Sequence, residues 1–124
     1  MQDVVDSAGR LLEAVEEGLA TSEQRDERFY LVELLRLKGE ALAMKGQELE
    51  AERWLREAIA VASQQEARLL ELRSAVSLCR LLRSDSQAIA VRELLEPACG
   101  WFAADVVAPD LLDARALLAA AHAP

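Results

Sequence analysis

Aromatic residues are scarce in this sequence, at 4% of its 124 residues, and only three prolines and five glycines are present. Alanine, leucine, glutamate and arginine dominate instead, and these residues favour helices over strands. Hydrophobic residues make up 52% of the chain and charged residues 29%, which indicates a folded domain with a modest core. The composition therefore predicts one helical domain over residues 1–124.

Histidine and cysteine are too few for most metal or nucleophile chemistry. A di-metal carboxylate bundle needs Glu-x-x-His motifs on facing helices, and the only histidine, His122, lies near the carboxyl end with alanine, not glutamate, three positions before it. Cys79 and Cys99 lie on apolar stripes without a neighbouring base, so core packing is favoured over a nucleophilic role. The sequence does not decide whether these two cysteines form a disulfide. We expect no enzyme activity, no cofactor and no metal.

Long apolar runs and an excess of positive charge are also lacking. No run approaches the roughly 20 residues of a membrane span, and the first residues have no basic, apolar leader pattern, so we expect a cytoplasmic protein. The net charge is −8, which would repel nucleic acid and anionic lipid. The function classes that remain are binding and structural roles.

Apolar residues recur at helical spacing in six segments, at about residues 3–20, 27–45, 48–64, 66–83, 86–103 and 109–122. Gly46 follows the second segment and is expected to end it with a left-handed conformation. Pro97 lies inside the fifth segment and predicts a kink or an early end there. Asp110 is expected to cap the last helix. The predicted fold is all-α, a right-handed stack of antiparallel helical hairpins with about six helices.

Two helix pairs resemble each other at a spacing of 38 or 39 residues. Glu33-Leu34 matches Glu71-Leu72, and Ala51 with Leu55 matches Ala90 with Leu94. Such a period is typical of stacked helical hairpins. Within the first pair, the residues that stand at the spacing of the small and apolar positions of the tetratricopeptide repeat are Gly39, Gly46, Ala51, Leu55 and Ala58. The chain therefore resembles that repeat family.

The stretch from Leu11 to Leu118 is similar, more specifically, to the C-terminal repeat segment of large bacterial signalling ATPases. The runs that carry this resemblance are residues 28–40, 67–73 and 100–111. The resemblance implies an α-solenoid with an orphan helix at 1–25, one repeat at 26–65, a second at 66–104 and a capping helix at 109–122. In those proteins the ATPase, cyclase and DNA-binding chemistry lies in other domains, and this sequence has no Walker lysine loop.

The resemblance thus implies a non-catalytic module for protein–protein interaction, the regulatory tail of a larger bacterial signalling or transcription-regulating ATPase. The alternative is a repeat domain that senses a small-molecule effector. Candidate partner-binding residues form the polar strips of two first helices: Glu33, Arg36 and Glu40, and Arg73, Ser77 and Arg80. First helices usually face the concave surface of such stacks, where they bind a protein or peptide. The alternative is a solvated face without a partner.

Self-association is the second expected kind of contact. The first helix lacks a hairpin partner, and an apolar free face would favour a homodimer, so the candidate self-interface residues are Leu11, Val15 and Trp54. Trp54 lies beside the inward stripe of its helix, either at a seam or at an exposed edge. Trp101 and Phe102 could form a recognition patch. Because both continue the apolar stripe of the fifth segment, we expect them to pack in the core instead.

Overall fold

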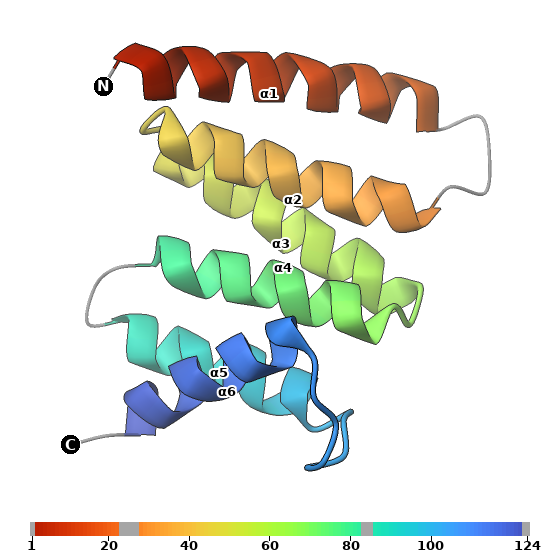
Figure 1. Cartoon of the computed structure of the whole chain (residues 1–124), viewed down its shortest axis with the longest axis vertical. Helices are drawn as coiled ribbons and strands as arrows, with labels where there is room; N and C mark the ends of the chain where they lie inside the picture. Colours follow the sequence, from red (N-terminus) through yellow and green to blue (C-terminus); the bar gives the residue numbers. More distant parts are fainter. Residues whose placement is uncertain (1, 23–27, 83–85, 123–124) are drawn as a thin grey trace.

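The computed structural model describes residues 2–22, 28–82 and 86–122, and within them the chain is all-α with six helices and no strand. The helices are α1 (Gln2–Ser22), α2 (Arg28–Met44), α3 (Glu48–Gln64), α4 (Arg68–Leu81), α5 (Ser86–Cys99) and α6 (Pro109–His122). Consecutive helices run antiparallel and pack against each other along the length of the stack (Figure 1). The predicted fold class is confirmed in this respect, and the hand of the stack stays a prediction.

Three parallel helices share one layer. α2 contacts α4, and α4 contacts α6, whereas α1, α3 and α5 make no such contacts with one another over the described residues. In Figure 1, α6 lies in front of α5, and α2 in front of α3. The side chains that α2, α4 and α6 direct away from the core therefore lie on one continuous surface.

Both helix-to-helix turns in the middle of the stack have the same backbone pattern. Gly46 follows α2 with a φ of +80°, and Glu66 follows α3 with a φ of +56°. In each turn this left-handed residue donates its N–H to the carbonyl three residues back, and the next residue donates to the carbonyl five residues back. These are the two bonds of a Schellman motif. The expectation for Gly46 is confirmed, and the left-handed Glu66 explains why α4 begins at Arg68 and not at 66.

Gly39 allows α2 and α3 to approach closely. A Cβ at this position would lie 2.7 Å from Leu55 Cγ and 3.1 Å from the Ala51 carbonyl oxygen. Leu55 is almost fully buried as a result. The rest of the core forms two clusters, one between α2 and α3 around Val32 and Ala58, and one among α4, α5 and α6 around Leu72 and Leu95.

Near the carboxyl end the structure differs from the sequence prediction at two residues, Trp101 and Asp110. The early end of the fifth helix is confirmed, because α5 stops at Cys99, two residues after Pro97. The core placement of Trp101 was wrong: the residue lies beyond the helix and is 60% exposed, although Phe102 does pack against the core. The capping role of Asp110 was also wrong. Pro109 already belongs to α6 and Leu112 donates its N–H to the Ala108 carbonyl, so Asp110 lies inside the first turn.

None of the six helices, over the residues that the structure describes, is long and apolar enough to cross a membrane.

Candidate functional site

The six predicted partner-binding residues lie together on the layer of α2, α4 and α6. Glu33, Arg36 and Glu40 come from α2, and Arg73, Ser77 and Arg80 come from α4; direct polar contacts join the two sets. Five of the six also line or adjoin a groove of about 410 Å³. We call this the arginine groove and define it by Arg36, Glu40, Leu69, Arg73, Val76, Ser77, Arg80, Ala108, Pro109, Asp110 and Asp113.

Arg73 is the centre of this groove and connects all three parallel helices. Its Nη1 lies 3.2 Å from Glu33 Oε1 on α2, and its Nη2 lies 2.9 Å from Asp110 Oδ2 on α6. The hydrogen bond to Asp110 is the main reason why the pKa of Arg73 is raised above its ordinary value. Arg73 therefore stays cationic and holds a carboxylate on either side.

Ser77 connects α2 and α4 one turn further along. Its hydroxyl donates to Glu40 Oε1 at 2.8 Å, and the same carboxylate oxygen accepts a bond from Arg36 Nη1 at 2.9 Å. Arg36 also donates to Glu33 at 2.9 Å, so the α2 strip is a continuous chain of ion pairs. The hydroxyl of Ser77, a buried residue, is thus satisfied by a charged acceptor, which makes this a well-ordered polar contact.

The open end of the groove is lined by more exposed charges. Arg80 Nη2 lies 3.3 Å from Asp113 Oδ2, and the two side chains are 59% and 52% exposed. An apolar part formed by Leu69, Val76 and the Ala108-Pro109 segment lies along the same groove. The groove is lined by three carboxylates, on Glu40, Asp110 and Asp113, and by three arginines, so these charges balance; Glu33 lies beside the groove, where it pairs with Arg36 and Arg73 and adds a fourth carboxylate.

The sequence prediction missed the contribution of α6. Asp110 was expected only as a helix cap, and Asp113, Ala108 and Pro109 were not singled out. The repeat in the sequence could have indicated this contribution. The Glu40–Ser77 contact and the Arg73–Asp110 contact each join residues 37 positions apart, which is close to the repeat period of 38 or 39 residues. Extending the repeat by one more period would have placed Asp110 beside Arg73.

The predicted self-interface residues come from two helices, Leu11 and Val15 from α1 and Trp54 from α3. Leu11 is half-buried on α1, and the side chain of Val15 lies outside the described part of the structure. The exposed residues of α1 that the structure describes are mostly charged or small: Asp6, Ser7, Arg10, Glu13, Ala14, Glu16 and Glu17. Self-association through this helix stays a prediction.

Trp54 belongs to a second groove, of about 330 Å³, between α2 and α3. We call it the tryptophan groove and define it by Leu31, Leu35, Arg53, Trp54, Glu57 and Val61. Lys38 Nζ lies 3.9 Å from the centroid of the Trp54 ring and 3.6 Å from Glu16 Oε1 on α1. Because Lys38 reaches both, the groove opens on the side of α2 that also contacts α1.

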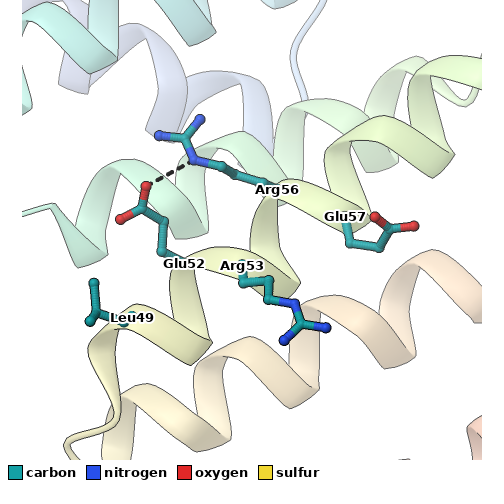
Figure 2. A pocket seen from close by; sticks show the side chains of 5 residues that line it. All are labelled: Leu49, Glu52, Arg53, Arg56 and Glu57. Atoms are coloured by element: carbon teal, nitrogen blue, oxygen red, sulfur yellow. Dashed lines mark hydrogen bonds and ion pairs between the residues drawn. The ribbon is translucent and has the colours of Figure 1, made fainter.

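A third hollow covers the outer face of α3 (Figure 2). All five lining side chains, Leu49, Glu52, Arg53, Arg56 and Glu57, come from this one helix. Arg56 Nε donates to Glu52 at 2.9 Å, one helical turn away. Because no second element contributes to this hollow, we interpret it as a solvated helix face.

The two cysteines and Trp101 do not line either groove. Neither thiol forms a disulfide, Cys79 is fully buried, and burial raises its pKa to about 11. Burial also raises the pKa of Cys99, partly offset by the charge of Arg115. A protonated, buried thiol is a poor nucleophile.

Trp101 contacts the start of α4. The Arg68 guanidinium stacks on the Trp101 ring, 3.7 Å from its centroid, and holds the segment after α5 against α4.

Among the described residues no group of three or more histidine, cysteine or acidic side chains could hold a metal ion; the side chain of His122 lies outside them. Comparison with protein-family profiles, with curated proteins and with solved structures finds no match to this chain.

Proposed function

We propose that this domain is a non-catalytic, tetratricopeptide-like interaction module, and that its arginine groove binds an extended segment of a partner protein. The single observation that supports this most is the groove itself, which runs across three parallel helices and joins an apolar strip to charged side chains. Helical-repeat proteins bind peptides on surfaces made by parallel first helices. The resemblance to signalling ATPases further suggests that the domain is a regulatory tail within a larger protein.

The partner that fits the groove best carries a basic side chain. The charges that line the groove balance, three carboxylates to three arginines, but Glu33 beside it adds a fourth carboxylate, and Asp113 and Glu40 are the most exposed carboxylates of the lining. The chain as a whole has a net charge of −8, which attracts a cationic partner and raises its association rate. A small apolar side chain of the partner would lie over Leu69 and Val76.

Two fluorescein-labelled, proline-rich decapeptides test this proposal, one with three lysines and one with three glutamates at the same positions. Proline-rich peptides stay extended and are thus suited to a groove across parallel helices. We expect the lysine peptide to bind and the glutamate peptide not to bind, in fluorescence anisotropy. Glu40→Gln and Asp113→Asn should each weaken binding severalfold, whereas Glu52→Gln, the same change on the outer face of α3, should not. Equal effects of all three variants would contradict the proposal.

Sensing of a small molecule is the second candidate. The volume of the arginine groove, about 410 Å³, falls within the range of small-ligand pockets, and its Ser, Arg and Asp side chains could hydrogen-bond a polar metabolite. We favour the peptide because the polar groups already satisfy one another and the groove is open along the helices. A thermal-shift series with monosaccharides separates the two: a rise in Tm that Arg80→Ala abolishes would favour the small molecule.

A further inference from the structure

The tryptophan groove lies on the opposite face of α2 from the arginine groove, and the proposed function does not use it. At 100° per residue, Leu31 and Leu35 lie roughly half a turn around the helix from Glu33, Arg36 and Glu40. α1 and α3 both contact α2 but do not contact each other over the described residues. The lining of the tryptophan groove comes from α2 and α3, and Lys38 beside Trp54 reaches Glu16 on α1.

The floor of this groove is apolar and contains one aromatic anchor. Leu35 is nearly fully buried, and Leu31, Trp54 and Val61 are half-buried. Trp54 is held in place, because Lys38 lies over its ring at 3.9 Å and is itself paired with Glu16. Ordered tryptophan side chains in apolar surroundings are frequent centres of protein interfaces.

Among the described residues, one charged side chain at the rim of the groove has no ion pair. The two cations nearest Trp54 are paired, Lys38 with Glu16 at 3.6 Å and Arg53 with Glu50 at 3.8 Å. Glu57 lines the groove but takes part in no ion pair or hydrogen bond among the described residues. A ligand that fills this groove would thus meet an apolar floor and one unpaired carboxylate.

Both helices beside the groove are acidic. The exposed charges of α1 that the structure describes are Asp6, Glu13, Glu16 and Glu17 against Arg10. α3 carries Glu48, Glu50, Glu52 and Glu57 against Arg53 and Arg56. A second copy of this chain would bring two such acidic surfaces together, and like charges across an interface are unfavourable. The charges favour a different, basic occupant.

We propose that the tryptophan groove binds a basic amphipathic helix of another protein. A helix lying between α1 and α3 would place apolar side chains, at spacings of three and four residues, over Trp54 and Leu35. A lysine or arginine at the edge of that apolar face would pair with Glu57. The acidic surface of α1 would attract the same partner at longer range.

The test uses the full chain with Trp101→Phe, which leaves Trp54 as the only tryptophan. The probe is a 14-residue helical peptide of leucine and lysine with apolar residues at i, i+3, i+4 and i+7, and the matched probe replaces every lysine by glutamate. The lysine peptide should shift the Trp54 emission to shorter wavelength with saturation, and the glutamate peptide should leave it unchanged. Glu57→Gln should weaken binding about fivefold, while Glu52→Gln, on the same helix outside the groove, should change it less than twofold.

Three results would overturn the proposal. The first is equal binding of both peptides, which would show that charge does not select the occupant. The second is an equal loss for Glu57→Gln and Glu52→Gln, which would show that the peptide binds elsewhere. The third is a shift of Trp54 emission with protein concentration alone, which would show that a second copy fills the groove. None of these results bears on Glu40 and Asp113, so the arginine groove is tested separately.

Discussion

Arg73 donates two hydrogen bonds to a single oxygen of Asp110, from Nε at 3.0 Å and from Nη2 at 2.9 Å. Its remaining nitrogen, Nη1, faces Glu33 at 3.2 Å. One side chain of α4 thus contacts both neighbouring helices of its layer through charged, directional bonds. Such charge-assisted contacts are stronger than neutral ones.

Asp110→Asn is expected to lower the free energy of unfolding by about 1 kcal/mol, since Asp110 is mostly shielded from solvent and loses a charged bond. Asp113→Asn on the same helix is the matched control, because the Asp113–Arg80 pair is more than half exposed and should contribute less than about 0.5 kcal/mol. Urea denaturation of the three proteins measures the difference. A similar loss in both variants would show that the loss of negative charge on α6, and not the Arg73 contact, is responsible.

Gly39→Ala should destabilise the fold, because the new methyl group would lie 2.7 Å from Leu55 Cγ. Overpacking of this kind costs about 1–3 kcal/mol, which outweighs the gain of roughly 1 kcal/mol from alanine in a helix. Gly9→Ala is the matched control: nothing lies within 4 Å of its Cβ position, so the helix gain of up to about 1 kcal/mol should appear alone. Thermal denaturation should therefore give opposite signs for the two variants, and the same sign in both would refute the close contact.

Glu66→Gly and Gly46→Ala should also have opposite effects. Both positions have positive φ, and only glycine adopts this region without strain. We expect Glu66→Gly to stabilise the protein and Gly46→Ala to destabilise it, each by about 1 kcal/mol. Chemical denaturation is again sufficient. A destabilising Glu66→Gly would mean that the glutamate side chain has a role beyond the turn.

The buried thiol of Cys79 predicts a pH dependence of stability. Burial raises its pKa from 9.0 to about 11, so the unfolded chain ionises at a lower pH than the folded one. The contribution is fully present below pH 9 and is lost as the pH rises through about 11, by at most about 3 kcal/mol. Cys79→Ala should remove this part of the decline in denaturation curves between pH 8 and 11. An unchanged decline would assign it to other groups.

Local signals in the sequence predicted most of the fold, and contacts between distant segments explain where the prediction failed. Helical periodicity gave the six helices, and Gly46 and Pro97 gave two of their ends. Glu66 gave no signal for its turn, because nothing in a glutamate side chain indicates a positive φ. Trp101 continues an apolar stripe in sequence, yet it lies beyond the helix end and contacts Arg68, a residue that periodicity within one helix cannot identify.

The candidate site was also predicted only in part, because some of its residues come together through packing between distant segments. The strips on α2 and α4 could be read from charges at helical spacing, and the structure brings them into contact. The tryptophan groove depends on how α1 and α3 flank α2, which is a property of packing. Trp54 was therefore identified as a residue of interest, while Glu57 and Lys38 beside it were not.

The two ends of the stack are attached unequally. Over the described residues α1 contacts only α2, whereas α6 contacts both α4 and α5, and α4 contacts every helix except α1. Loss of the contacts between α1 and α2 therefore detaches α1, while the other five helices keep all their mutual contacts. Detachment of α6 at the opposite end must break its contacts with both α4 and α5. Amide hydrogens of α1 should accordingly exchange with solvent first and those of α4 last, so the chain would unravel from its amino-terminal end.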